Sequence, residues 1–563
     1  MTSTTYGHGV VPGSPEREGA DASGTAPVRD RPLLSYRSYI GGEDTAGEGW
    51  VYTISSRSLL EDVFSSISLK RELERNPDSP SAEHPYVVGR VAAATTEEID
   101  LSLEAAAQAA PRWAMVPLEQ RLELGALFRE TLLANRQTFL DMLVAEGHPV
   151  KLARWELSCL LEVYCPESIG WYHKRMHSEC EYRGRRLISR RAPDGVVCLN
   201  PPQNAPAPSA ALAVLAMMAG NAVVVRAPRS IPLSTMYVLR DLVAPLLEKI
   251  GAPPGTLNVV CSNPRQTMDR WVESPFVDDI FYIGGSEEGM RFQAKAIANG
   301  KKPILELAGN DTIAVWKDAD LEKAAEAITE SFYGSGQICM VPNSVLAHPD
   351  IADALIEQIK IKVRGIRPGY PEDENVLLSP VRRSEKFFGL LNQALEGGAE
   401  LICGGHRMEL DGTPSETGVF LEPTVLRVDG LPRARELEVV QKETFFPLIP
   451  VVVPELVPHN EMRELFVDYI NSNAYGLRNS LWSGSPRVID QFVLRVVNGG
   501  LLKVNDSHIG FLPYLPSHGG TGLTGGVFGE ANYPMLKTSH LQGVSVSAEA
   551  ISPYKAVFGD DED

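Results

Sequence analysis

A cysteine in a glycine-rich stretch is the first candidate for chemistry in this sequence. Cys339 ends the segment Gly336-Gln-Ile-Cys339, and further small residues precede it at Gly334 and Ser335. The thiolate form of cysteine is the nucleophile, whereas an unperturbed thiol has a pKa of about 8.5. Small neighbours would let a carbonyl compound and a second ligand approach the sulfur closely. Taken alone, the pattern is more typical of a buried structural cysteine than of a nucleophile.

A carboxylate in apolar surroundings is the second candidate. Glu306 lies in the run Leu305-Glu-Leu-Ala-Gly-Asn-Asp311, where a strand-like apolar stretch is followed by a glycine. Transfer into apolar surroundings raises the pKa of a carboxyl group toward the range that suits a general base near neutral pH. In isolation, a glutamate in an ion pair or a helix cap explains the pattern equally well.

Together, the two segments resemble the aldehyde dehydrogenase superfamily, which carries a glutamate in E-L-G-G-K/N and a cysteine in G-Q-x-C. Here the first motif reads Glu306-Leu-Ala-Gly-Asn310, with Ala308 in place of the first glycine. Further motifs follow in the family's order, so the resemblance covers roughly residues 36–548. It implies that Cys339 is the nucleophile and that Glu306 is the base that activates water.

Residues 195–206 are similar to the strand and P-W-N-x-P turn of the family. The sequence GVVCLNPPQNAP matches the family asparagine to Asn204, and Asn200, which directly precedes a proline, is the rival assignment. The resemblance implies that the Asn204 amide and the Cys339 backbone N–H donate to the oxyanion formed when thiolate attacks a carbonyl. The tryptophan–lysine pair usual in the next helix is absent, so the substrate tunnel departs from the family pattern.

Residues 223–233 resemble the family strand that ends in K-P-A/S-E. Arg226 stands where a lysine usually meets the adenosine ribose, and Arg229 stands where a glutamate often binds the ribose hydroxyls. A glutamate repels a 2′-phosphate, whereas an arginine attracts it and can bind it with two hydrogen bonds. We therefore expect NADP or NAD as the cofactor, with Arg229 favouring NADP. Two solvated surface arginines are the alternative.

Three later segments resemble other binding motifs of the family. Glu443-Thr-Phe445 is similar to E-x-F-G-P, which implies that Glu443 binds the nicotinamide ribose and that Phe445 packs on the cofactor; Phe446 replaces the usual glycine. His518, in a P-F-G-G-like stretch, would either hydrogen-bond a polar substrate or serve as a packing residue. A turn like F-T-G-S-x-x-x-G would meet the pyrophosphate at a helix N-terminus through Gly284, Gly285, Ser286 and Gly289.

Short apolar runs alternate with helical stretches in the part of the chain that must position these residues. Thr95-Thr-Glu-Glu98 is a capping box that opens a helix, and the apolar stretch 205–220 is expected to be a buried helix. The alternation predicts βαβ units with parallel sheets. The expected strands are 223–225, 257–261, 280–283, 312–316 and 449–453.

The resemblance implies a Rossmann-like cofactor domain, an α/β catalytic domain and a small β element for oligomerisation. We expect the cofactor domain at residues 33–307 and the catalytic domain at 308–515, with 516–532 returning to the cofactor domain. The oligomerisation element would combine a basic hairpin at 178–193 with a strand at 533–550, because exposed strand edges often pair with another subunit. A disordered N-terminal tail, a surface insertion and a C-terminal tail are expected at 1–32, 60–85 and 551–563.

Composition narrows the class of protein further. The 563 residues carry a net charge of −19, which is unfavourable for binding a nucleic-acid backbone. The sequence has no stretch of the ~18–20 apolar residues that a membrane span requires, and its polar N-terminus does not resemble a secretion signal. The seven scattered cysteines form no CxxC pair, which argues against disulfides and a metal site. A cytoplasmic protein is expected.

The resemblance therefore implies oxidation of a small-molecule aldehyde to an acid by a homodimer or homotetramer. One alternative is a CoA-acylating enzyme or acyl-thioester reductase, in which a thiol takes the acyl group; the presence of Glu306 favours water. Another is an inactive family member that serves as a binding or scaffold protein. Intact Cys339, Glu306 and Glu443 argue against that alternative.

Overall fold

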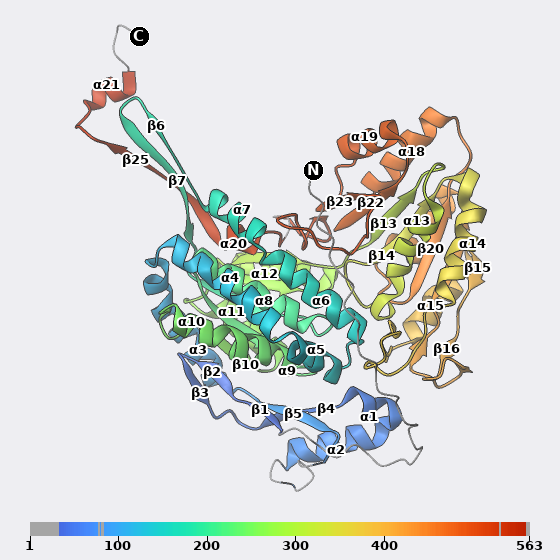
Figure 1. The fold of residues 1–563 in the computed structure, drawn as a ribbon, viewed down its shortest axis with the longest axis horizontal. Coiled ribbons are helices and arrows are strands. Elements are labelled where there is room, and N and C mark those ends of the chain that lie inside the picture. The colour runs from blue at the N-terminus through green and yellow to red at the C-terminus, as the bar shows by residue number, and fades with distance from the viewer. Residues whose placement is uncertain (1–32, 77–78, 80–83, 528–530, 559–563) are drawn as a thin grey trace, which may run out of the picture.

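Two seven-stranded sheets carry most of the chain (Figure 1). The computed structural model describes residues 33–558 except 77–78, 80–83 and 528–530, so the tails expected at 1–32 and 559–563 lie outside the described residues. The predicted α/β class is confirmed. The first sheet contains, in spatial order, β12 (Lys302–Glu306), β11 (Asp279–Ile283), β8 (Val196–Asn200), β9 (Ala222–Ala227), β10 (Leu257–Cys261), β2 (Ser38–Ile40) and β3 (Glu43–Thr45).

The first sheet is parallel from β12 to β10, with β2 and β3 added antiparallel at one edge. Helix α3 (Thr96–Ala114) begins at the predicted capping box: Glu98 N–H donates to the Thr95 hydroxyl at 3.1 Å, and Thr95 N–H donates to the Glu98 carboxylate at 2.9 Å. Helices on both sides cover the β-branched faces of these strands. They include α4 (Leu118–Ala134), α8 (Pro206–Ala219), a π-helix (Tyr237–Val243), α10 (Ala244–Lys249), α11 (Pro264–Glu273) and α12 (Ser286–Ala298).

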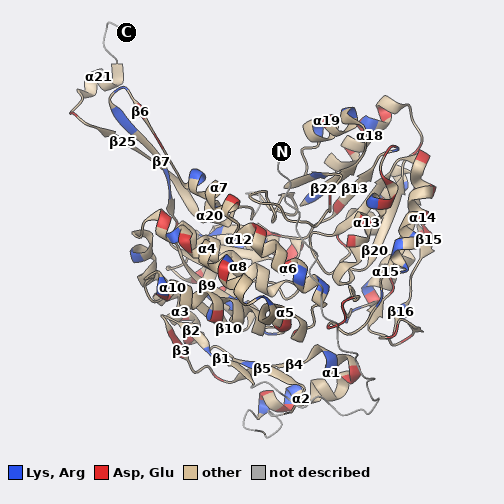
Figure 2. Ribbon diagram, viewed as in Figure 1, with Lys and Arg blue, Asp and Glu red and all other residues tan. Residues whose placement is uncertain are grey.

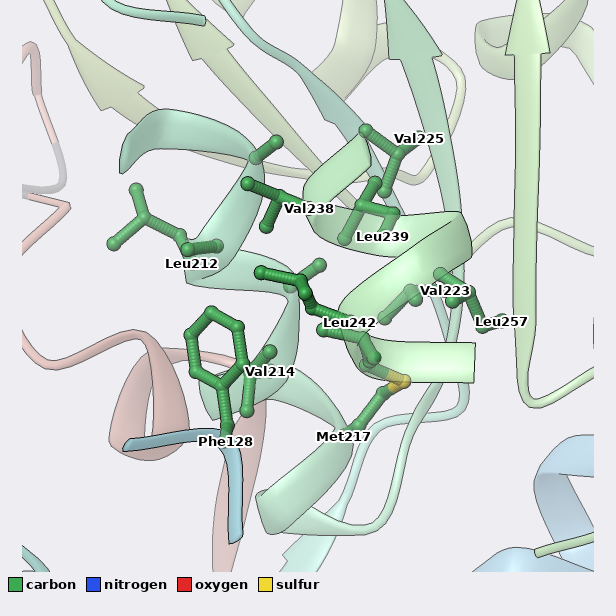
Figure 3. Close-up of a cluster of buried hydrophobic side chains, with 14 of the residues drawn as sticks. Phe128, Leu212, Val214, Met217, Val223, Val225, Val238, Leu239, Leu242 and Leu257 are labelled. Carbon is green, nitrogen blue, oxygen red and sulfur yellow. The ribbon is translucent and has the colours of Figure 1, made fainter. Parts of the chain in front are cut away.

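The helix predicted at 205–220 lies at the centre of the largest hydrophobic core. Every residue of α8 except Pro208 is buried, and Figure 3 shows Leu212 and Met217 of this helix beside Phe128 of α4 and Val225 of β9. Gly220 ends the helix with a φ of 111°, and a Cβ there would overlap the Arg121 side chain. A helix that is apolar on all sides must be buried in this way, so the prediction is confirmed.

The second sheet contains β15 (Glu400–Cys403), β19 (Thr424–Asp429), β20 (Leu448–Val453), β14 (Pro342–Ala347), β13 (Asp311–Val315), β22 (Arg478–Trp482) and β23 (Leu501–Val504). Its strands are parallel except β15. Helix α13 (Leu321–Thr329) continues as a 3₁₀-helix (Glu330–Gly336). Other helices of this half are α14 (Ala352–Val363), α15 (Glu385–Glu396), α16 (Leu431–Ala434), α17 (Glu438–Gln441), α18 (His459–Asn471) and α19 (Pro486–Arg495).

A three-stranded sheet projects from the body of the molecule (Figure 1). The predicted hairpin is confirmed as β6 (His177–Tyr182) and β7 (Arg185–Pro193), and β25 (Ser539–Ser547) pairs with β7. The strand is shorter than the predicted 533–550, because Pro534 opens a helical turn, α20 (Pro534–Lys537); the expected C-terminal tail contains α21 (Pro553–Phe558). Basic residues lie along this sheet (Figure 2), and its role in oligomerisation stays a prediction.

The segment that includes the insertion expected at 60–85 packs against both halves of the molecule. It forms α1 (Ser56–Glu61) and α2 (Val63–Arg75) between β4 (Trp50–Ile54) and β5 (Val87–Ala92), which form a three-stranded sheet with β1 (Leu34–Tyr36). The Ser56 hydroxyl donates to the Val144 carbonyl at 3.2 Å, whereas Tyr370 of the second half donates to Glu61 at 3.2 Å.

The remaining helices and strands are short or peripheral. The remaining elements are α5 (Arg136–Ala145), α6 (Val150–Val163), α7 (Pro166–Met176), α9 (Leu233–Met236), a 3₁₀-helix (Pro349–Ile351), β16 (Arg407–Met408), β17 (Pro414–Ser415), β18 (Phe420–Leu421), β21 (Tyr475–Gly476) and β24 (Thr521–Gly522).

None of the described helices is both long and apolar enough to cross a membrane.

Candidate active site

A kinked segment at the end of the 3₁₀-helix leads to Cys339. Gly334, Ser335 and Gly336 all have φ between 58° and 70°, a region that non-glycine residues rarely adopt. A Cβ on Gly336 would lie 2.2 Å from the Phe446 carbonyl oxygen, so only glycine fits there. The Ser335 hydroxyl donates to the Ser379 carbonyl at 2.5 Å. These contacts fix the backbone that leads to the thiol.

The structure brings Cys339 and Glu306 together from the two sheets. Glu306 is the last residue of β12 in the first sheet, and Cys339 lies three positions before the start of β14 in the second. The Cys339 thiol donates to Glu306 Oε1 at 3.6 Å. Glu306 is only 2% exposed, and its Oε2 has no hydrogen-bond partner among the described residues. An unpaired carboxylate oxygen beside a thiol can accept a proton from the thiol or from a water molecule.

Burial keeps both groups protonated at rest. It raises the pKa of Glu306 to about 8. Burial also raises the pKa of the Cys339 thiol well above its usual value, and the negative charges of Glu306 and Glu443 raise it further. The nucleophile therefore requires removal of its proton, and the Glu306 carboxylate is close enough to take it.

Asn204, rather than Asn200, lies beside the loop of Cys339. The Asn204 amide donates to the Gln337 carbonyl at 3.1 Å, and an amide NH₂ group has a second hydrogen for another acceptor. Asn200 ends β8 and accepts a hydrogen bond from Arg226. The geometry therefore favours Asn204 over its rival for contact with a ligand at the sulfur.

The two predicted ribose residues have different surroundings. Arg226 is 6% exposed, and besides Asn200 it donates to the carbonyls of Ala227 and Ser262, both at 3.4 Å. Arg229 is exposed in the loop after β9, where it is free to meet an anion. Its side chain makes no hydrogen bond or ion pair with the described residues. The hydrogen bond from Arg226 to Asn200, in contrast, links the carboxyl ends of β8 and β9.

The predicted glycine turn opens α12 at the carboxyl end of β11. Gly285 is the N-cap and, having no side chain, gives no cap hydrogen bond to the first N–H groups of the helix. A Cβ on Gly289 would overlap Leu307, which shows that this glycine serves helix–strand packing. Gly284 N–H donates to the Glu306 carbonyl at 3.0 Å, and the Ser286 hydroxyl donates to Leu523. This helix terminus can hold a phosphate group.

Glu443 lies near the thiol, in the segment that precedes β20. Its Oε1 accepts the Gly309 N–H at 3.0 Å, and burial raises the pKa of Glu443 to about 8. Phe445 has a φ of 61°, a strained value for a non-glycine residue. The next residue, Phe446, packs edge-on against Phe387 with ring centres 5.9 Å apart.

His518 lines an apolar pocket in front of α8. Its Nδ1 and the Ser517 hydroxyl are 2.7 Å apart, and burial lowers the pKa of His518 to about 3, so the ring is neutral. Cys339 is not part of the pocket wall. The pocket is lined by Val163, Ser168, Tyr172, Leu212, Leu215, Phe511, Leu512, Tyr514, Leu515, Ser517, His518, Tyr533 and Pro534.

Comparison with known proteins identifies the family. The model of the "Aldehyde dehydrogenase family" matches residues 75–539, most of the chain. The chain belongs to the aldehyde dehydrogenase family. It is 28% identical to a D-glyceraldehyde dehydrogenase (NADP(+)) of Thermoplasma acidophilum, over 74% of this chain and 82% of that protein. It is 30% identical to a vanillin dehydrogenase of Pseudomonas fluorescens, over 70% of this chain and 79% of that one.

Solved structures of aldehyde dehydrogenases share the fold. An NAD-dependent aldehyde dehydrogenase from Sinorhizobium meliloti superposes with a TM-score of 0.76 at 23% identity, covering 94% of this chain and 98% of that one. A 3,6-anhydro-L-galactose dehydrogenase in complex with NAP gives 0.71 at 24%, covering 91% and 100%. This aldehyde dehydrogenase is thus an oxidoreductase that acts on aldehydes. The expectation of NAD or NADP agrees with relatives named for each cofactor.

The sequence motifs did not point to a group of buried polar residues at the amino edge of the second sheet. Arg478 and Asp311 are both 1% exposed, and His508 is fully buried. Arg478 N–H donates to Asp311 Oδ1 at 3.1 Å, and His508 Nε2 lies 3.4 Å from Asp311 Oδ2. The available signal was a charged residue within a run that otherwise resembles a core strand, residues 477–482.

Proposed function

We propose that this aldehyde dehydrogenase oxidises an aldehyde to a carboxylic acid through a thioester on Cys339, with NAD(P) as hydride acceptor and water as acyl acceptor. The observation that carries the proposal is the 3.6 Å contact between the Cys339 thiol and Glu306 Oε1. A thiol and a carboxyl group with raised pKa, adjacent to each other and supplied by two sheets, suit a nucleophile and its base.

The residues of the chain act in a defined order. Glu306 in its ionised form takes the thiol proton, and the thiolate forms a C–S bond to the aldehyde carbonyl carbon. The Cys339 N–H and the free hydrogen of the Asn204 amide donate to the resulting oxyanion. NAD(P), when bound, accepts the hydride that leaves this carbon as the carbonyl re-forms. Glu306, having released its proton to solvent, deprotonates the water that attacks the thioester, and the thiolate leaves with the C–S bond electrons.

Several residues of the chain suit a dinucleotide cofactor. The open N–H groups at the start of α12 suit a pyrophosphate, and the Glu443 carboxylate suits ribose hydroxyls. Phe445 would pack against the nicotinamide side. Exposed Arg229 would meet the adenosine ribose and favour the 2′-phosphate of NADP. Arg226, which is held by Asn200, would contribute through its place at the end of β9.

The test is substitution of the nucleophile. Cys339→Ala should abolish NAD(P)H formation with any aldehyde that the wild type oxidises, because no covalent intermediate can form. Cys403→Ala is the matched control, since Cys403 is a partly buried cysteine on β15 at the far edge of the second sheet. A panel of aldehydes that includes D-glyceraldehyde, benzaldehyde and vanillin takes three of the substrates named for relatives. NAD(P)H formation by Cys339→Ala would refute the nucleophile.

Product analysis tests the acyl acceptor. With water as acceptor, the product is the free acid with or without added CoA. In Glu306→Gln the thioester should form slowly at high pH, where solvent hydroxide deprotonates the thiol, and should then persist on Cys339, where mass spectrometry detects it. If CoA converted the product into its thioester and raised the turnover rate, water would not be the acceptor. The enzyme would then belong to the CoA-acylating class.

A further inference from the structure

Arg478 is a buried cation without a carboxylate partner. It is the first residue of β22 and only 1% exposed. Its Nη1 donates to the His508 carbonyl and its Nη2 to the Ser517 carbonyl, each at 3.0 Å. Within the described part of the chain, its Nε has no hydrogen-bond partner and its guanidinium makes no ion pair. An unpaired buried charge is unfavourable. A neighbouring group that is negative, or becomes negative during the reaction, would stabilise the Arg478 guanidinium.

The sheet order places Arg478 close to Cys339. Strands β14, β13 and β22 are parallel neighbours in the right-hand sheet of Figure 1 and begin at the same edge. Cys339 precedes β14 by three positions, and Arg478 opens β22. Gly309 meets both regions: a Cβ there would lie 2.3 Å from the Cys339 carbonyl oxygen and 3.3 Å from the Leu477 side chain. Because parallel neighbours are about 4.8 Å apart, the two strand starts are separated by about 10 Å.

The charges around the thiol give Arg478 a distinct role. The carboxyl groups that act on the Cys339 thiol come from β12, β13 and the segment before β20, and Arg478 is the principal cation among the described groups. The carboxyl groups facing Cys339 are Glu306, Asp311 and Glu443. The titratable groups around the Arg478 guanidinium are Cys159, Glu306, Asp311, Cys339, Lys503, His508 and His518.

The two hydrogen bonds from Arg478 to backbone carbonyls also fix the wall of the apolar pocket. They bracket residues 508–517, and Phe511 within this segment lies 5.2 Å from the guanidinium, measured to its ring centre. Phe511 and His518 face each other edge-on in the pocket wall, with ring centres 5.9 Å apart. One side chain therefore connects the start of β22 to the segment that shapes the apolar pocket.

We propose that Arg478 is a positioning residue for the reaction: its positive charge favours the Cys339 thiolate over the neutral thiol, and its two carbonyl bonds hold the pocket wall at residues 508–517. The inference rests on the proposed function only in taking Cys339 as the nucleophile. The electrostatic role and the structural role can be tested separately. Lysine keeps the positive charge but has one donor group in place of the arginine fork, whereas glutamine removes the charge and keeps an amide donor.

The experiment compares full-length wild type with Arg478→Gln, Arg478→Lys and Arg463→Gln. Arg463 is the matched control: it is 7% exposed, its Nε is also unpartnered, and it lies on α18 behind the sheet, where it bonds Asn460. The rate at which iodoacetamide alkylates Cys339 is followed by peptide mass spectrometry from pH 6 to 10. KM and kcat are measured with the best aldehyde of the panel, and near-UV circular dichroism reports folding.

Arg478→Gln should slow alkylation about tenfold at pH 8 and move its midpoint up by about one pH unit, as expected for a charge about 10 Å away at an effective dielectric constant of about 20. Arg478→Lys should keep the midpoint but raise KM several-fold, because an ammonium group cannot hold both carbonyls. Arg463→Gln should change neither.

Three results would overturn the proposal. An unchanged midpoint in folded Arg478→Gln would remove the electrostatic role. A midpoint shift in Arg478→Lys would show that packing, not charge, acts on the thiol, and this variant decides the question even if the glutamine variant does not fold. An unchanged KM in Arg478→Lys would remove the role in the pocket wall. Failure of wild-type Cys339 to react at any pH would instead refute the proposed nucleophile.

Discussion

Glu306 gives the hydrolysis of the acyl-enzyme a specific pH dependence. Burial raises the pKa of Glu306 to about 8, and only its ionised form can deprotonate water. The ionised fraction is then about 9% at pH 7, about 50% at pH 8 and about 91% at pH 9. If hydrolysis requires this base, its rate constant should rise about tenfold between pH 7 and 9, with half of the rise complete near pH 8.

The assay isolates the hydrolysis step. Excess enzyme and cofactor are mixed with limiting aldehyde, and the thioester on Cys339 is quantified by mass spectrometry as it decays. In Glu306→Gln the decay should be at least 100-fold slower at pH 9, since a positioned general base contributes about 10²–10⁴-fold, and the tenfold rise should be lost.

Glu443→Gln is the necessary control, because burial raises the pKa of Glu443 to about 8 as well. This variant should keep the rise in the hydrolysis rate and bind the cofactor more weakly. If the rise survived in Glu306→Gln, or vanished in Glu443→Gln, Glu306 would not be the base. A decay rate that does not change with pH in the wild type would refute the argument from burial itself.

Three further predictions follow from single positions. Gly336→Ala should lower the free energy of unfolding by at least about 2 kcal/mol and kcat/KM about 100-fold, since its Cβ would overlap the Phe446 carbonyl; chemical denaturation and steady-state kinetics measure both. Arg229→Gln should shift the ratio of kcat/KM for NADP over NAD about tenfold toward NAD, through loss of one charge-assisted contact, and an unchanged ratio would contradict its contact with the 2′-phosphate. Glu306→Gln should be more stable than wild type by about 3 kcal/mol at pH 7, because folding raises the Glu306 pKa from 4.5 to about 8. The folded state thus binds an extra proton between these values, so wild-type stability falls as pH rises through this window; melting curves at pH 5 and 8 measure the widening difference.

Local signals predicted elements whose physical cause is local. The capping box at Thr95 depends on two side chains three residues apart, and both of its hydrogen bonds are present. The strand at 257–261 was predicted at its observed bounds, because a β-branched run between turn residues has few other structures available. The helix at 534–537 was missed because its start depends on Pro534, which also follows strand-like residues.

Contacts between segments far apart in sequence were not predictable from local patterns. The placement of Arg478 follows from the order β14–β13–β22, which no local pattern encodes. In the same way, the hydrogen bond from Arg226 to Asn200 depends on the parallel register of β8 and β9. Only the resemblance to the family predicted that Cys339 and Glu306 act together, because each motif taken alone has an equally good structural explanation.

Three buried carboxyl groups with raised pKa surround one thiol, and this arrangement limits the charge that the site can hold. Burial raises the pKa of Glu306, Asp311 and Glu443 each to about 8. Because like charges raise each other's pKa, loss of one proton makes the next loss harder, so the protons belong to the group of carboxyls rather than to one residue. The positive charge of Arg478 acts on Glu306 and Asp311, and that of Lys386 acts on Glu443. At pH 7 the carboxyls are therefore mostly protonated, and the first negative charge that forms as the pH rises toward 8 can reside on Glu306 or, after proton transfer over 3.6 Å, on Cys339.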